Sequence, residues 1–319
     1  KNDHKIMKTP VALIIFNRLQ ETRRVFDVIR AAKPEKLFII SDGPRNKEEA
    51  VTCASVRAIV ENIDWPCEVQ RNYSETNLGC KKRVSTGIDW VFEHVDKAII
   101  LEDDCLPEPT FFSFCEELLE RYRDDEKVMH VSGNFFHQKN KNFVSQNSYF
   151  FSSIPHIWGW ATWKRAWKKY DVNMKEWSGL RKSGDLEKIF NNAAAYEYWS
   201  TIWDQYQAGK IDSWDGQWLF ACIKNQGICI NPTKNLISNV GFGVTATHTK
   251  KSSLFASMPT EPLSFPLSHP QKIEVNTKAD DFTWRQNFGI NRKLSQRILG
   301  PLRRKFPSSY ATIRNLFRK

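Results

Sequence analysis

The sequence has few cysteines, and they form no recognisable motif. Seven Cys are scattered over 319 residues, their number is odd, and no C-x-x-C occurs. This distribution argues against a disulfide framework and against a zinc site. It favours a reducing compartment, where thiols stay unpaired.

Long apolar runs are also missing. A membrane-spanning helix needs about 18–20 apolar residues in succession, and the apolar run from Val11 to Phe16 is far shorter. No apolar stretch of the signal-peptide type follows the charged start at residues 1–5. We therefore expect a cytoplasmic protein, and an N-terminal anchor outside this sequence is the alternative.

Glycine and proline are too scarce for two further classes of protein. The 14 Gly and 14 Pro exclude a collagen-like or low-complexity chain. The contents of 41% hydrophobic and 13% aromatic residues exclude wholesale disorder. The length suits one large domain with an appendage.

Acidic residues are absent from the end of the chain. Residues 291–319 hold nine Lys or Arg and no Asp or Glu, so the formal charge of +11 for the whole chain leaves only +2 for the first 290 residues. Apolar residues alternate with the basic ones, which predicts a basic amphipathic tail that holds the protein peripherally at an anionic inner membrane face. The alternative is a helix that packs on its own domain with a solvated basic face.

Short apolar strands alternate with amphipathic helices over the first 130 residues. Strand-like runs occur at 11–16, 37–40, 67–70, 97–101 and 128–132, and segments with helical apolar spacing separate them. This alternation predicts an α/β fold whose mostly parallel sheet carries helices on both faces. In such folds ligands bind at the carboxyl ends of the strands.

The pattern changes after residue 133. Nine of the twelve Trp lie between residues 134 and 250, where we expect hairpins and irregular loops around helices. Residues 251–290 become polar and Pro-rich, which is typical of a linker or a strap along the surface.

Charged residues mark the ends of three predicted strands. Arg18 follows the first strand, Asp42 the second, and Glu102, Asp103 and Asp104 the fourth. Three successive carboxylates at a sheet edge are costly unless a cation binds there. Mg²⁺ or Mn²⁺, held by carboxylates and substrate phosphates, would suit them. A solvated acidic turn is the alternative, with Arg18 as an ordinary surface residue.

No glycine-rich phosphate loop is present. The sequence lacks G-x-x-x-x-G-K-[ST] and G-x-G-x-x-G, which argues against a P-loop and against a dinucleotide-binding fingerprint. A nucleotide would then be held through a metal ion.

An ordered set of short motifs covers residues 10–250. The set comprises an apolar strand before Asn17-Arg18, Ile39-Ile-Ser-Asp42-Gly43, Asn77-Leu-Gly79 before a helix with Arg83, Ile99-Ile-Leu-Glu102-Asp103-Asp104, Ile157-Trp-Gly-Trp160 and Ser213-Trp-Asp215-Gly-Gln-Trp218. In this order the motifs resemble those of GT-A nucleotide-sugar glycosyltransferases. More narrowly, they resemble the N-acetylglucosaminyltransferase I type of inverting enzyme and its bacterial relatives.

The resemblance implies a GT-A domain over residues 1–250, with a nucleotide-binding half at 1–132 and an acceptor and catalytic half at 133–250. Asp104 would bind Mn²⁺ or Mg²⁺ and bridge to the donor diphosphate. Asp215 would be the catalytic base, and Asp212 is its rival because Asp215-Gly216 stands where animal members have paired acids. The other expected contacts with the nucleotide sugar are Arg18, Asp42, Arg83, Glu102, Asp103, Trp160 and His248.

The resulting hypothesis is a metal-dependent inverting glycosyltransferase of the hexosyl- or N-acetylhexosaminyl-transferase type. It would move a sugar from a nucleotide-diphosphate donor to a hydroxyl of a saccharide or lipid-linked saccharide, in surface polysaccharide or glycan synthesis. A sugar nucleotidyltransferase is one alternative, and a non-enzymatic protein that binds nucleic acid or membrane is another. No RNA- or DNA-binding motif occurs, so we expect no nucleic-acid partner.

Overall fold

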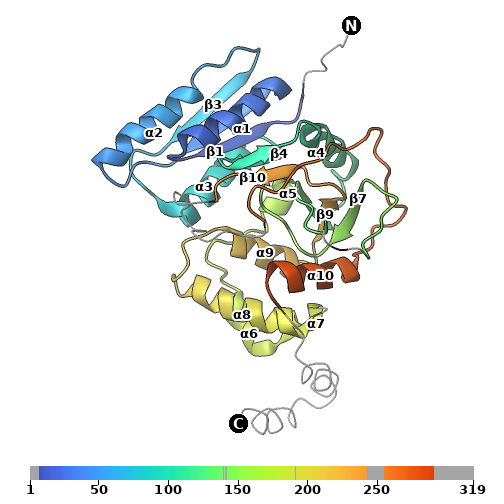
Figure 1. The fold of residues 1–319 in the computed structure, drawn as a ribbon. Helices are drawn as coiled ribbons and strands as arrows, with labels where there is room; N and C mark the ends of the chain where they lie inside the picture. Colours follow the sequence, from blue (N-terminus) through green and yellow to red (C-terminus); the bar gives the residue numbers. More distant parts are fainter. Residues whose placement is uncertain (1–6, 139, 141, 191, 243–254, 291–319) are drawn as a thin grey trace, which may run out of the picture.

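One eight-stranded sheet organises the chain (Figure 1). The computed structural model describes residues 7–138, 140, 142–190, 192–242 and 255–290. The strand order is β3-β2-β1-β4-β8-β6-β9-β7. Its strands are β1 (Val11–Ile15), β2 (Lys36–Ser41), β3 (Glu68–Tyr73), β4 (Lys97–Glu102), β6 (Val128–Ser132), β7 (Tyr149–Ser152), β8 (Trp160–Trp163) and β9 (Ile228–Pro232).

Parallel pairing dominates the first half of the sheet. Strands β3, β2, β1 and β4 are parallel neighbours, and β6 is parallel to β9. β8 and β7 run antiparallel to their neighbours. A small antiparallel pair, β5 (Cys105–Pro107) with β10 (Ile237–Asn239), lies beside the end of β4.

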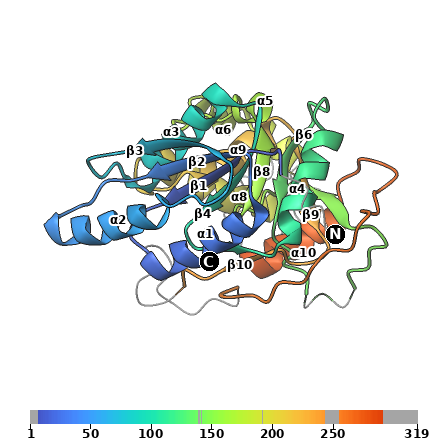
Figure 2. The same ribbon diagram turned by 90° about the horizontal axis from the view of Figure 1, so that it is seen from above.

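Helices cover both faces of the sheet, as Figure 2 shows for α1 and α3. One apolar core includes residues of α1 (Leu19–Ala32), α2 (Lys47–Ile59) and α4 (Thr110–Arg121). The core on the other face includes residues of α3 (Gly79–His94), α5 (Lys164–Trp167) and α9 (Asp215–Lys224). Because both faces are covered, β1 is buried at every position and reads as a continuous apolar run. The predicted α/β fold, with a mostly parallel sheet and helices on both faces, is therefore confirmed.

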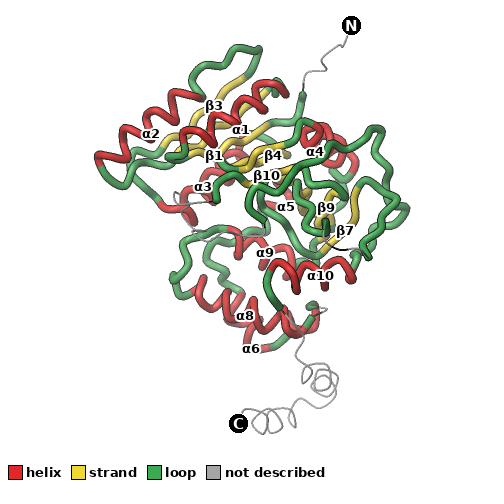
Figure 3. Tube along the Cα trace, viewed as in Figure 1, coloured by secondary structure: helices red, strands yellow, loops and turns green. Residues whose placement is uncertain are grey.

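A third core lies beyond the sheet, where Figure 3 shows helices with few strands. It joins α9 to four further helices, and its largest fully buried side chains include Trp177 and Trp203. The four helices are α6 (Trp177–Ser183), α7 (Asp185–Ile189), α8 (Ala193–Gln207) and α10 (Thr277–Asn287). Many of the tryptophans between residues 134 and 250 thus build cores.

The segment after β10 contains a helix that the sequence analysis did not predict. Residues 255–276 carry no helix or extended strand, whereas α10 inserts Trp284 into the third core. The predicted basic tail, 291–319, lies outside the described residues. Within the described ranges, no helix is long and apolar enough to cross a membrane.

Candidate functional site

The order in which the chain adds strands to the sheet reverses at β1. The chain passes from β1 to β2 and β3 on one side, and then returns to place β4 on the other side of β1. In open α/β sheets ligands bind at such a switch point, outside the carboxyl ends of the strands. The residues at this point are Arg18, which follows β1, and the acidic triplet that begins with Glu102 at the end of β4.

Arg18 holds two of the three acids together. Its Nη1 lies 2.8 Å from Oδ1 of Asp103 and 2.9 Å from Oδ2 of Asp104. The backbone N–H of Phe16 donates to Oδ2 of Asp103 at 3.1 Å. Burial raises the pKa of Asp103 to about 6, against the opposing effect of the Arg18 charge. The structure thus brings together three of the predicted residues from two strand ends.

Glu102 is the acid with the least compensation. Burial raises its pKa to about 8, and the charges of Asp104 and Asp103 add to the effect while Arg18 opposes it. Its carboxylate makes no hydrogen bond with any residue that the structure describes. A carboxyl group whose pKa is raised this far, at the carboxyl end of a strand, indicates a functional site.

The chemistry of these side chains fits a hard divalent cation. Asp103 and Asp104 share one guanidinium, which leaves excess negative charge on oxygen, the ligand atom that Mg²⁺ and Mn²⁺ prefer. Among the described residues, no three His, Cys, Asp or Glu side chains surround one point. Such a cation would therefore be held by Asp104 with few other protein ligands, and substrate phosphates and water would complete its coordination.

A second chain segment covers Asp104 closely. The backbone N–H of Val240 donates to the main-chain oxygen of Asp104 at 2.8 Å, just after β10 pairs with β5. At Gly241, a Cβ atom would lie 2.2 Å from Oδ2 of Asp104, so only glycine fits this approach. The segment then leads into residues 243–254; His248, predicted to contact the donor, lies there, outside the described residues.

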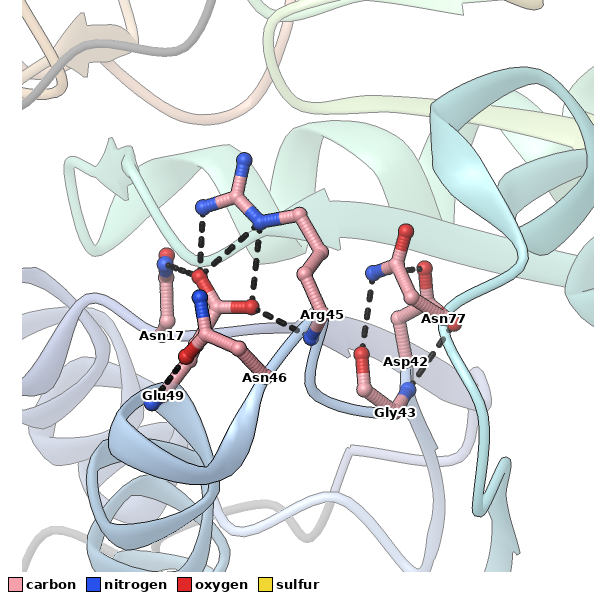
Figure 4. A network of polar contacts seen from close by, with 7 residues as sticks. All are labelled: Asn17, Asp42, Gly43, Arg45, Asn46, Glu49 and Asn77. Carbon is pink, nitrogen blue, oxygen red and sulfur yellow. Dashed lines mark hydrogen bonds and ion pairs between the residues drawn. The ribbon is translucent and has the colours of Figure 1, made fainter.

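Asp42 has a different role from the predicted contact with the nucleotide sugar. Its Oδ1 accepts from the N–H groups of Gly43 and Leu78, both at 2.9 Å. Its Oδ2 accepts from Nδ2 of Asn77 at 3.0 Å (Figure 4) and from the N–H of Gly79 at 3.2 Å. Four donors occupy this buried carboxylate, so the expectation is corrected: Asp42 fixes the start of α3 to the end of β2.

Arg83 is also part of the scaffold. The side chain is buried, and Nη2 donates to the main-chain and side-chain oxygens of Asn72 at 2.8 and 2.9 Å. Burial lowers the pKa of this guanidinium. Arg83 thus joins α3 to the end of β3, and its contact with a nucleotide sugar stays a prediction.

A polar network that the sequence analysis missed lies at the ends of β1 and β2 (Figure 4). Glu49 accepts from Nδ2 of Asn17 and from the N–H of Arg45, each at 2.7 Å. Asn46 caps α2 by accepting from the N–H of Glu49 at 2.8 Å. The Arg45 guanidinium lies 5.4 Å from the ring centre of Phe16. The spacing Asn46-x-x-Glu49 is a capping-box signature that could have located the network.

The two candidates for the catalytic base are held in different ways. Asp215 begins α9, and its Oδ1 accepts from the hydroxyls of Tyr206, at 2.9 Å, and Ser213. Its Oδ2 makes no hydrogen bond with any described residue. Asp212, by contrast, uses both oxygens to accept from the N–H groups of Cys80 at 3.1 Å and Lys81 at 3.0 Å, which caps α3. Asp215 therefore keeps an oxygen for a ligand.

Cys80, near the start of α3, lies within the electrostatic influence of both Glu102 and Asp215. Burial raises the pKa of the Cys80 thiol, and the charges of Glu102, Asp215 and Asp212 raise it further. Asp215 also contributes to the raised pKa of Glu102. The acid at the end of β4 and the acid at the start of α9 therefore belong to one electrostatic cluster, although more than a hundred residues separate them in the sequence.

The prediction that Trp160 faces a sugar is wrong. Its side chain is fully buried, lies 5.4 Å from the ring of Trp214 in a stacked arrangement, and stacks on His130 at 5.0 Å. The cause is the period-two alternation of β8, which directs Trp160 into the core below α3 and α9. Trp158, two residues earlier, is only half-buried.

Comparisons with known proteins give distant similarities. No protein-family model and no curated protein matches the sequence. The galactosyltransferase LgtC in complex with donor and acceptor sugar analogues is 11% identical, with 91% of this chain and 99% of that chain covered and a TM-score of 0.36. UDP-glucose pyrophosphorylase complexed with UDP-glucose is 11% identical, with 46% of this chain and 63% of that chain covered and a TM-score of 0.26.

A third solved structure is 4-diphosphocytidyl-2C-methyl-D-erythritol synthase from Anaerococcus prevotii, at 12% identity, with 73% of this chain and 90% of that chain covered and a TM-score of 0.31. The chain spans less than two thirds of the length of the UDP-glucose pyrophosphorylase and of an active-site mutant of LgtC, at 63% and 65%. Similarity of this size leaves the activity to be argued from the site itself.

Proposed function

We propose that the protein is a glycosyltransferase that moves a sugar from a nucleotide-diphosphate donor to a hydroxyl of a saccharide. The observation that carries this proposal is the acid cluster at the switch point, where Asp103 and Asp104 share Arg18 and the carboxyl group of Glu102, whose pKa burial raises, lies beside them. Such excess of carboxylate suits a substrate that brings phosphates together with a divalent cation.

The donor would lie across the ends of β1, β2 and β4. Arg18 offers a planar guanidinium that matches phosphate oxygens, and Asp104 would hold Mn²⁺ or Mg²⁺. When bound, this ion would neutralise the charge that builds on the departing diphosphate. The base and ribose would meet the polar network of Asn17, Arg45 and Glu49 at the ends of β1 and β2.

The transfer would proceed in one displacement with Asp215 as the base. Oδ2 of Asp215 takes the proton from the acceptor hydroxyl, and that oxygen forms a bond to the anomeric carbon. The bond from the anomeric carbon to the diphosphate oxygen breaks, and its electron pair leaves on the nucleoside diphosphate. Attack from the opposite side inverts the anomeric configuration, as in the N-acetylglucosaminyltransferase I type. Tyr206 and Ser213 orient the base.

A sugar nucleotidyltransferase is the weaker candidate. Such an enzyme usually wraps a glycine-rich loop around the phosphates after the first strand. Here β1 ends at Ile15 and α1 begins at Leu19, which leaves only Phe16, Asn17 and Arg18 between them. These three residues carry no glycine and form no phosphate loop.

The acceptor class and the place of action extend the same proposal. A saccharide or lipid-linked saccharide in polysaccharide or glycan synthesis would suit an enzyme held at a membrane face by its basic end. Deletion of residues 291–319 would then abolish co-sedimentation with anionic vesicles and leave transfer in solution intact. Unchanged co-sedimentation would contradict this membrane role.

A thermal-shift screen tests the proposed function. Nucleoside diphosphates should raise the melting temperature in the presence of MnCl₂ and much less with EDTA, because a ligand that binds only the folded state stabilises it. Incubation with nucleotide-diphosphate sugars and saccharides should release the nucleoside diphosphate. Stabilisation by nucleoside triphosphates with release of pyrophosphate would instead show a nucleotidyltransferase. No stabilisation by any nucleotide would contradict both.

A further inference from the structure

An aromatic cluster borders the acid site on the side away from the nucleotide network. Phe136 lies at its centre, with ring centres 4.7 Å from His156, 5.5 Å from Trp158 and 5.1 Å from Phe255. Trp158 also meets Phe242 at 5.5 Å. These five residues, the aromatic cluster, come from four separate places in the chain, and all except the buried His156 are half-buried.

Backbone geometry fixes the cluster beside Asp104. Phe242 directly follows Gly241, the residue whose backbone approaches the Asp104 carboxylate too closely for any side chain. On the other side, Gly159 adopts φ +63° and has no room for a Cβ beside Ile237. This conformation, which favours glycine, separates Trp158 from the buried Trp160. Trp158 therefore packs with Phe242 and not with the core below α9.

The order of strands places the cluster on the acceptor side. Along the carboxyl edge of the sheet, the polar network of Asn17 and Glu49 lies at β1 and β2, and the acids lie at β4. β8 is the next neighbour, and because it runs antiparallel to β4, its first residues lie at this same edge. Trp158 precedes β8, and Phe136 follows β6. The acids thus separate the cluster from the nucleotide network.

The cluster is uncharged around neutral pH. Burial lowers the pKa of His156 to about 3, so the imidazole stays neutral. Pyranose rings present apolar C–H faces, for which aromatic side chains offer large apolar surfaces. The neutral aromatic cluster adjoins carboxylates. It therefore suits a ligand that has one apolar face and carries hydroxyls on its edges.

We propose that the aromatic cluster binds the apolar face of a pyranose ring in the acceptor saccharide, with Trp158 as the main contact. The assignment rests on the proposed function, because the transferred sugar must lie at the acids and the acceptor must lie beyond it. Trp158 is a binding residue here and takes no part in the proton transfer.

Saturation-transfer difference NMR tests the contact. The probes are the methyl β-glycosides of glucose, galactose and N-acetylglucosamine, each recorded with UDP and MnCl₂. Wild type should transfer magnetisation to ring C–H protons, Trp158→Ala should lose the signal, and Trp158→Phe should keep part of it. Trp90→Ala is the matched control, because Trp90 is another half-buried tryptophan, eleven residues beyond the start of α3, and it should behave as wild type.

The outcomes separate this inference from the proposed function. If nucleoside diphosphates stabilise wild type but no glycoside contacts it, or if Trp158→Ala binds the glycosides as wild type does, the acceptor assignment is wrong and the proposed function stands. If neither nucleotides nor glycosides bind, both are wrong. If Trp158→Ala melts far below wild type, saturation-transfer difference NMR on Trp158→Phe and Phe136→Ala decides whether the aromatic cluster contacts the glycosides.

Discussion

Gly241 and Asp104 are in such close contact that a Cβ atom on the glycine would lie 2.2 Å from the carboxylate oxygen Oδ2. Gly241→Ala must therefore displace either the carboxylate or the segment after β10. Overpacking of this kind costs about 1–3 kcal/mol. Where the complex with a nucleoside diphosphate and MnCl₂ is the state that is destabilised, its Kd should rise by about tenfold to a hundredfold. Calorimetry measures this change.

Gly179→Ala is the control for this prediction, because nothing lies within 4 Å of a Cβ at Gly179 in α6. It should leave the nucleotide Kd unchanged. Equal affinity in Gly241→Ala and wild type would show that the Asp104 carboxylate does not have to keep this position for binding.

Asp104→Asn should remove the part of nucleotide binding that depends on a divalent cation. The substitution keeps the shape of the side chain but removes the charge that a cation needs. A ligand at one hundred times its Kd stabilises the folded state by about 2.7 kcal/mol, and most of this gain should be absent in thermal unfolding with UDP and MnCl₂. Asp27→Asn, at an exposed ion pair with Arg30 on α1, is the control. A full cation-dependent gain in Asp104→Asn would contradict the site.

Asp215→Asn should separate binding from chemistry. The amide cannot take a proton from the acceptor hydroxyl, and the loss of a general base typically costs about 10²–10⁴ in rate. Donor affinity, measured by calorimetry, should stay close to wild type, because the proposed donor contacts lie at the ends of β1 and β4. If turnover survives in Asp215→Asn and collapses in Asp212→Asn, then Asp212, the rival candidate, is the base.

Asp212→Ala should affect stability and not the chemical step. Its carboxylate accepts from two N–H groups at the start of α3, and the loss of such a cap costs about 0.5–2 kcal/mol. Urea unfolding should show this loss while the turnover of folded enzyme is kept. Asp171→Ala is a matched control away from the acids, since Asp171 likewise accepts from two N–H groups, those of Asn173 and Lys175.

His130 should make stability depend on pH below 6.5. Burial lowers its pKa to about 3, whereas an unfolded chain titrates near 6.5. Between these values the unfolded state binds one more proton, so the free energy of unfolding is highest above pH 6.5 and falls as the pH falls. One proton corresponds to about 1.4 kcal/mol per pH unit.

His130→Gln can accept from Nε1 of Trp218 and donate to the main-chain oxygen of His156, as the imidazole does. It should therefore make the slope between pH 6 and pH 5 shallower by one proton in urea unfolding. An unchanged slope would show that the imidazole already accepts its proton in the folded state.

The parts of the site that lie at strand ends could be predicted from the sequence. Arg18 and the acids that begin at Glu102 each follow an apolar run of strand length, and parallel strands place their carboxyl ends at one edge. The ion pairs of Arg18 with Asp103 and Asp104 agree with that placement. Only local information was needed, because strand direction alone decides which edge a strand-end residue occupies.

Residues whose roles depend on distant partners could not be predicted. Asp42 and Asp212 carry the same side chain as Asp104, yet both cap the start of α3, and Asp212 does so across more than a hundred residues of sequence. Trp160 and Trp158 are two residues apart, and the turn at Gly159 places one in the core and the other beside Phe242.

The sequence by itself determined the alternation of strands and helices and the position of the acidic triplet, since both depend on short-range patterns of apolar and charged residues. The tertiary structure decided which carboxylates are already occupied, which tryptophan is only half-buried and how closely Gly241 approaches Asp104. These depend on which atoms from distant segments come within hydrogen-bonding or van der Waals distance, and only the packed chain brings those atoms together.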